Sequence, residues 1–175
     1  MKKLTILFLF LNFVLFPQEI KENVNQALQT CFGKNIQIHY EKIKIDPNLK
    51  KEIENIAGQK FFSDEVHFYK IFESDRIAGL AILDNVYGKS LPITIIVMFD
   101  PNGKILCSEI IKYREPYGGA VQSKEWNSQF KGKDDQSGFV VGRDINSISG
   151  ATISVNSVTK GIKKLTLLIK KLLKK

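Results

Sequence analysis

The chain has 175 residues, 43% of them hydrophobic and 25% charged, which is typical of one globular domain with a buried core. This composition excludes a disordered, collagen-like or multi-spanning protein. The formal net charge is +8, and lysines are concentrated near the two ends of the chain. Without a zinc-finger, helix-turn-helix or RNA-recognition signature, this charge does not indicate a nucleic-acid-binding protein.

The N-terminal segment predicts export. Lys2 and Lys3 precede an apolar run, Leu4–Phe16, and Pro17 breaks it. The run is shorter than the ~20 residues of a transmembrane helix and fits the hydrophobic region of a secretory signal. No pair of small residues marks a cleavage site, so an uncleaved signal anchor is the alternative. We expect a signal or anchor over residues 1–18 and one domain over residues 19–175, in the periplasm or at the extracytoplasmic face of the membrane.

The next segments alternate between helix and strand. Apolar residues on one side predict a helix over Ile20–Phe32, and alternation predicts a strand over Ile36–Ile45. Asp46 is a favourable helix N-cap and Pro47 a favourable first residue, so we expect a second helix from there to about Ala57.

The middle of the chain is rich in β-forming residues. Four such runs are separated by turn-forming Gly, Asn, Asp and Ser residues, which predicts an antiparallel meander. With helices before and after it, the fold class is α+β: an antiparallel sheet, as a meander or half-barrel, flanked by helices. The four runs are Val66–Phe72, Ile77–Asp84, Ile93–Phe99 and Ile105–Tyr113.

A glycine-containing loop, Glu115–Gly119, follows the last predicted strand. Its two glycines allow a bulky or flat group to approach the backbone closely. Trp126 and Phe130 come soon after, in a polar stretch. They are either hydrophobic plugs under a loop or part of the wall of a pocket for a planar ring.

The stretch Ser149-Gly150-Ala151-Thr152 opens the long amphipathic helix expected at the C-terminus. Apolar residues recur at spacings of three and four from Val155 to Leu172, which predicts one buried helical stripe. Free N–H groups and the positive end of the helix dipole meet at such a start and suit a phosphate. The alternative is that Ser149 or Thr152 is only an N-cap.

The two cysteines, Cys31 and Cys107, show no metal-binding spacing. They either pair in an oxidising compartment or are separate buried thiols, and we favour buried thiols. The sequence also contains no nucleophile elbow, phosphate-binding Walker loop or dinucleotide fingerprint. No catalytic residue or metal ligand is therefore assigned.

Two blocks of residues together resemble the FMN-binding domain family. The family motif is similar to D-x-x-S/T-G-A-T and matches Asn146–Thr152. The second block matches Gly88, Pro92-Ile93, the Asp100–Gly103 turn and the Glu115–Gly119 loop. The resemblance covers roughly residues 79–168. The family includes the FMN-carrying periplasmic subunits of sodium-pumping NADH:quinone reductase and of Rnf complexes.

The resemblance implies that FMN is bound covalently, as a phosphoester on Thr152, and that a separate flavin transferase attaches it from FAD with a divalent metal. It further implies an electron-transfer flavoprotein or oxidoreductase subunit, not a stand-alone catalyst, that works with a redox partner protein or a membrane complex. The cofactor-binding residues it implies are Thr152, Ser149, Gly150, Ala151, Glu115, Gly118, Gly119 and Ile93.

One position departs from the family motif, because Asn146 stands where the motif has an acid. Asp144 precedes it by two residues. The alternatives are that Asp144 replaces the acid through a shifted loop, that attachment is less efficient, or that FMN is bound non-covalently or not at all.

A second function hypothesis belongs to a different class. Seven lysines and no acid lie in residues 160–175. The chain would then be a non-redox, surface-associated binding module whose basic helix docks on anionic lipid or an acidic partner. A solvated helix face is the simpler explanation of these lysines.

Overall fold

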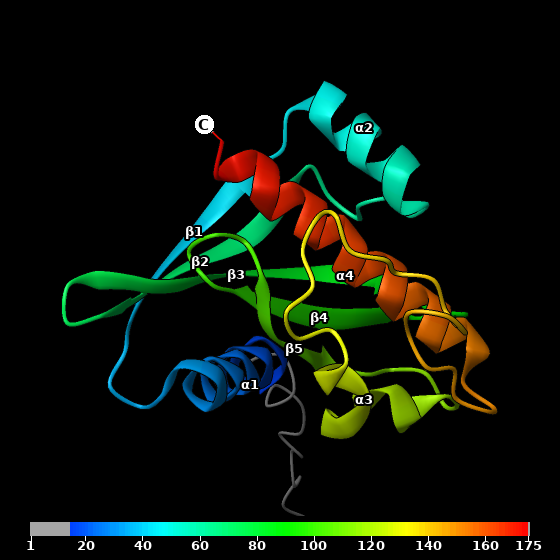
Figure 1. Cartoon of the computed structure of the whole chain (residues 1–175). Coiled ribbons are helices and arrows are strands. Elements are labelled where there is room, and N and C mark those ends of the chain that lie inside the picture. Colours follow the sequence, from blue (N-terminus) through cyan, green and yellow to red (C-terminus); the bar gives the residue numbers. More distant parts are fainter. Residues whose placement is uncertain (1–14, 175) are drawn as a thin grey trace, which may run out of the picture.

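A five-stranded antiparallel sheet organises the protein (Figure 1). The computed structural model describes residues 15–174, so most of the predicted signal segment over residues 1–18 lies outside the described residues. Neighbouring strands in the sheet are also consecutive in the chain, so the predicted antiparallel meander is confirmed. They are β1 (Gln37–Lys44), β2 (Glu65–Glu73), β3 (Arg76–Tyr87), β4 (Pro92–Phe99) and β5 (Ile105–Lys112).

Helices cover both faces of the sheet, which confirms the α+β class. Figure 1 shows the long α4 across one face with α2 outside it, and α1 on the other face. A short 3₁₀ turn, η1, and α3 connect β5 to the loop before α4. None of the helices in the described range combines the length and hydropathy needed to cross a bilayer. Their bounds are α1 Leu15–Phe32, α2 Pro47–Ala57, η1 Gly119–Gln122, α3 Lys124–Ser128 and α4 Thr152–Leu172.

The predicted boundaries of α2 are confirmed in detail. The carboxylate of Asp46 accepts hydrogen bonds from the backbone N–H groups of Asn48 and Leu49, both at 3.0 Å, and Pro47 is the first helical residue. Gly58 ends the helix with a φ of 67°. By contrast, α1 begins earlier than the predicted Ile20, because a proline in the first turn of a helix removes no needed hydrogen bond.

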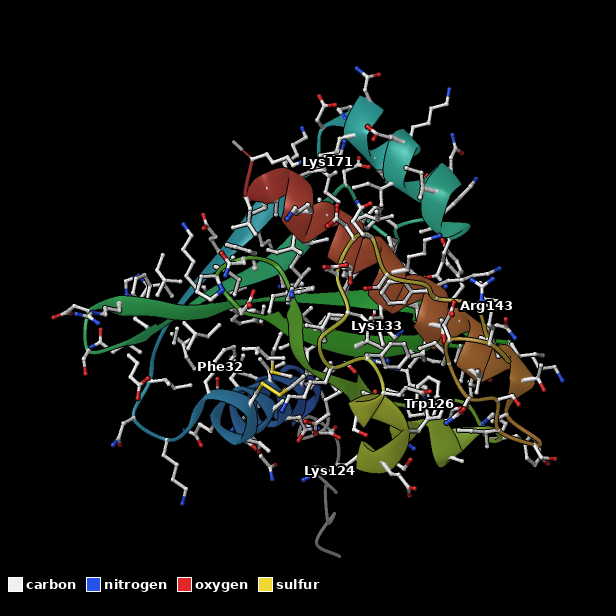
Figure 2. All side chains as sticks on the ribbon, viewed as in Figure 1. Phe32, Lys124, Trp126, Lys133, Arg143 and Lys171 are labelled. Carbon is white, nitrogen blue, oxygen red and sulfur yellow. A yellow bond between two sulfur atoms is a disulfide. The ribbon has the colours of Figure 1, made fainter. Side chains whose placement is uncertain are left out.

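Each face of the sheet has its own hydrophobic core. The larger core lies under α4 and α2, and the smaller one lies under α1, where Leu28 packs with Ile71 and Ile96. Beside the smaller core, Cys31 and Cys107 form a disulfide, seen near the end of α1 in Figure 2. Our preference for separate buried thiols is therefore wrong: packing of α1 on β5 brings together two cysteines that are 76 residues apart.

The basic helix α4 is only partly a solvated face. Lys164 is fully buried, and its Nζ lies 2.9 Å from a carboxylate oxygen of Asp84 and 4.3 Å from the ring centroid of Phe61. Lys163 donates to the backbone carbonyl of Ile56 at 2.9 Å. Several of these lysines thus stabilise the fold, which weakens the hypothesis of a basic docking face.

Candidate functional site

Thr152 is the first residue of α4 and is exposed to solvent. Gly150 makes the preceding turn with a φ of 75°, and Ala151 is the N-cap. No side chain caps this helix. The alternative that Ser149 or Thr152 is merely an N-cap is therefore wrong. The free N–H groups of the first turn and the helix dipole favour an anion at Thr152.

Hydrogen bonds with α3 and the residue that follows it fix the loop that carries the motif. The indole N–H of Trp126 donates to the backbone carbonyl of Asn146 at 2.8 Å, and the backbone N–H of Asn146 donates to Gln129 at 2.7 Å. Trp126 is buried edge-on against Phe130, with ring centroids 5.2 Å apart (Figure 2). These two rings are plugs under the motif loop, not the wall of a ring pocket.

Asp144 is engaged in its own turn. Its carboxylate accepts hydrogen bonds from the backbone N–H of Val140 at 2.9 Å and from the guanidinium of Arg143 at 3.1 Å. The Arg143 bond is the largest of the effects that lower the pKa of Asp144. This arrangement gives no support to Asp144 as a substitute for the motif acid. Asn146 occupies the position of that acid in the motif, and its side chain is exposed.

The loop after β5 docks on the first turn of α4. The Tyr113 hydroxyl lies 2.8 Å from the Ser154 hydroxyl and also donates to the backbone carbonyl of Tyr117. A Cβ built on Gly118 would lie 2.6 Å from the Ser154 oxygen, so only glycine allows this approach. Two predicted site elements, Gly118 and the start of α4, are thus in contact.

Replacing Gly118 by alanine should destabilise the protein and loosen the start of α4. The φ of 82° alone costs a non-glycine residue about 1–2 kcal/mol, and the clash with Ser154 adds to it. The free energy of unfolding in urea measures the loss. Gly132→Ala is the matched control, because Gly132 has nearly the same φ, 81°, but no atom within 4 Å of the added Cβ. Equal losses in the two variants would contradict this packing.

Glu115 contacts the turn between β3 and β4 instead of α4. Its carboxylate accepts the backbone N–H groups of Ser90 at 2.6 Å and Leu91 at 2.9 Å. These backbone bonds lower the pKa of Glu115. A Cβ on Gly88 would lie 2.4 Å from the same carboxylate, which explains why a glycine begins this turn.

The turn that Glu115 holds should open in acid. Because the folded-state pKa of Glu115 is lowered, its contribution to stability is present above the ordinary value of 4.5 and is lost as the pH falls through the lower folded-state pKa. Hydrogen exchange of the Ser90 and Leu91 amides should accelerate there, relative to the intrinsic rate. In Glu115→Gln the pH dependence should disappear, and its persistence would contradict the assignment.

An open groove of about 450 Å³ lies between α4, the segment that follows α2, and the end of β3. Thr152, Asn156 and Lys160 are four residues apart and share one helical face, and Asn156 and Lys160 line the groove. Asn156 donates to the Thr152 carbonyl at 2.8 Å. The rest of the lining is Gly58, Gln59, Lys60, Tyr87, Gly88 and Ser157.

The chemistry of the groove fits FMN. The side-chain oxygen of Gln59 is buried and accepts no hydrogen bond, while its amide nitrogen donates to the Ser157 carbonyl at 3.1 Å. That oxygen is enclosed beside α4, 3.3 Å from the position that a Cβ on Gly161 would take, and does not face the open groove. Tyr87 offers an exposed aromatic face beside it, and the uncapped helix start suits the phosphate.

The predicted site residues are thus only partly assembled. Ser149, Gly150, Ala151 and Thr152 form the turn at α4, with Gly118 against it and Gly119 starting η1. Glu115 acts through the Gly88 turn. Ile93 is fully buried in the core and lines neither the groove nor the turn.

Sequence reasoning missed most of the groove residues, including Gln59, Tyr87, Asn156 and Lys160. Asn156 and Lys160 carry a signal, because they follow Thr152 at helical spacing on the polar side of the stripe. Gln59 and Tyr87 carry none, because only the folded sheet and α2 bring them to α4.

The fold and the groove define an α+β domain suited to a phosphate-bearing, planar cofactor. Residues 88–166 match the model of the FMN-binding domain family, which confirms the resemblance found in the sequence. The match begins at Gly88 in the groove and includes Thr152.

One relative and one solved structure extend the comparison. The chain is 26% identical over 137 residues to a subunit of the proton-translocating ferredoxin:NAD(+) oxidoreductase complex of Clostridium ljungdahlii, covering 74% of this chain and 71% of the relative. The crystal structure of Shewanella oneidensis NqrC superposes with a TM-score of 0.58 at 17% identity, covering 91% of this chain and 99% of NqrC. The latter match shows a shared fold.

Proposed function

We propose that this protein is the FMN-carrying subunit of an Rnf- or Nqr-type electron-transfer complex, with FMN attached to Thr152. The single observation that carries the proposal is the exposed threonine at the uncapped start of a long helix, within the matched family domain. The similarity to a subunit of the Clostridium ljungdahlii oxidoreductase complex supports a place in a membrane complex.

Each part of the groove has a role in holding FMN. The N–H groups at the start of α4 would hold the phosphate, whose negative charge the helix dipole favours. Tyr87, which lines the groove with an exposed ring, would contact the ring of FMN. Lys160 would supply positive charge that favours a reduced, negatively charged ring. When bound, FMN supplies one- and two-electron redox chemistry, and the protein positions it and tunes its potential.

Attachment to Thr152 requires help from outside this chain, because a threonine hydroxyl is a weak nucleophile at neutral pH. A flavin transferase with FAD and a divalent metal would supply it. The bond between Thr152 Oγ and phosphorus forms, the phosphoanhydride of FAD breaks, AMP leaves, and a base of the transferase takes up the hydroxyl proton. A covalent link would also keep the cofactor from diffusing away outside the cytoplasm, where the proposed signal or anchor directs the domain.

An electrochemical titration of the flavin-loaded protein tests both the relay and the groove. We expect reversible reduction and reoxidation in wild type. Lys160→Ala should lower the reduction potential by tens of millivolts, because it removes a positive charge beside the ring. Lys163→Ala removes an equal charge that contacts α2 outside the groove, and it should change the potential much less. Irreversible reduction would contradict the relay, and equal shifts in the two variants would contradict the ring position.

A further inference from the structure

The face of the sheet under α1 contains a larger cavity than the groove at Thr152. Helix α1 packs on β5 and β4, so it covers only part of this face. A cavity of about 730 Å³ lies between α1 and the paired strands β1 and β2, with β3 and β4 at its base. This volume is in the range of small-molecule sites.

Aromatic rings from β1 and β2 form one wall of this cavity. Tyr40 lies opposite Tyr69, with ring centroids 5.3 Å apart, and its hydroxyl lies 2.9 Å from Nδ1 of His67. Burial raises the pKa of Tyr69 to about 12 and lowers the pKa of His67. At neutral pH the His67 and Tyr69 side chains are therefore uncharged, and this aromatic wall is suited to a planar ring.

A positioned cation lies at the base of the cavity. Nη1 of Arg114 donates to the Pro92 carbonyl at 3.0 Å and to the Thr94 hydroxyl at 2.9 Å, and Thr94 in turn donates to the side-chain oxygen of Asn85 at 2.7 Å. Within residues 15–174, the Nη2 and Nε groups of Arg114 and the amide nitrogen of Asn85 donate no hydrogen bond. These donors line the cavity and suit an anionic oxygen.

The acidic groups nearby are already paired. Glu65 lies 3.9 Å from Lys42, and Asp84 pairs with Lys164 on the other face of the sheet. Glu19, whose charge acts on Arg114, is bonded to Lys112 at 2.7 Å. The cavity therefore keeps an excess of positive charge from Arg114 and Lys21.

We infer that this cavity binds a planar aromatic anion, with its ring against the Tyr40 wall and its acidic group on Arg114. The site is separate from the proposed FMN position and independent of it. The two sites are neighbours: Phe62 lines the cavity, Tyr87 lines the groove, and their rings stack with centroids 3.9 Å apart.

The test uses the full chain without flavin and 1-naphthoate as the probe. Isothermal titration calorimetry should show saturable binding of one molecule per chain, and NMR should show shifts of the Tyr40 and His67 side chains. Arg114→Gln should weaken binding about tenfold or more, because it removes a charge-assisted hydrogen bond. Arg143→Gln, on the exposed turn before α4, should leave the affinity unchanged.

A second pair of measurements keeps the inference testable when Arg114→Gln folds poorly. The neutral analogue 1-naphthalenemethanol should bind wild type about tenfold more weakly than 1-naphthoate. Tyr40→Ala, at a half-exposed position, should weaken both ligands by a similar factor. No saturable binding below about 1 mM, or equal affinities for the acid and the alcohol, would overturn the inference. Neither result would bear on FMN at Thr152, because the protein tested carries no flavin.

Discussion

Thr152→Ala should abolish covalent flavin attachment completely. When the full chain is co-expressed with a flavin transferase, wild type should give a flavin-fluorescent band on a denaturing gel and the variant should give none. The expected effect is all-or-none, because alanine has no oxygen to form the phosphoester. Thr152 is exposed at the first position of α4, so its loss should leave the fold intact.

Two companion variants make the Thr152 experiment specific. Thr152→Ser keeps a hydroxyl and should restore part of the fluorescence, whereas Ser149→Ala removes the other exposed hydroxyl of the turn and should retain it. Asn146→Asp restores the acid of the family motif and should increase the labelled fraction. Fluorescence retained in Thr152→Ala would show that the flavin is attached to a residue other than Thr152.

Lys164→Ala should destabilise the protein by about 3–5 kcal/mol, because it leaves the buried carboxylate of Asp84 without its partner. Burial lowers the pKa of Lys164, and the nearby Asp84 carboxylate opposes that effect. The variant also loses the bond from Lys164 to the Lys60 carbonyl at 3.1 Å. The free energy of unfolding from urea denaturation measures the change.

The control for Lys164 lies next to it in the chain. Lys163→Ala removes a half-buried lysine from the same turn of α4 and should cost no more than about 1 kcal/mol. Replacing both partners with apolar residues, Lys164→Met with Asp84→Leu, should recover most of the lost stability. A loss in Lys164→Ala no larger than that in Lys163→Ala would show that the ion pair contributes little.

Local signals predicted most of the fold. The strands and α2 follow from alternation and from the caps at Asp46 and Gly58, which act within a few residues. The disulfide and the burial of Lys164 were not predictable in this way. Both depend on contacts between distant segments: α1 with β5, and α4 with β3. Periodicity predicts which face of the helix a lysine occupies. It does not predict that an aspartate on the sheet, Asp84, faces Lys164 in the fold.

The candidate site also has a part that local sequence signals predict and a part that depends on contacts between distant segments. The turn at Thr152 was predictable, because a Ser-Gly-Ala-Thr stretch before an apolar stripe is a local pattern. The groove beside it was not, since Gln59 reaches it from the segment after α2 and Tyr87 from the end of β3. Trp126 was ambiguous in the sequence for the same reason: its role depends on the Asn146 carbonyl 20 residues away.

Peptide mapping by mass spectrometry of the protein from cells that contain a flavin transferase tests the central claim most directly. We predict that the peptide containing Thr152 is heavier by one FMN less one water, and that fragmentation assigns the added mass to Thr152. An unmodified Thr152 peptide in a protein that nevertheless carries FMN, or the same added mass on another residue, would contradict the account.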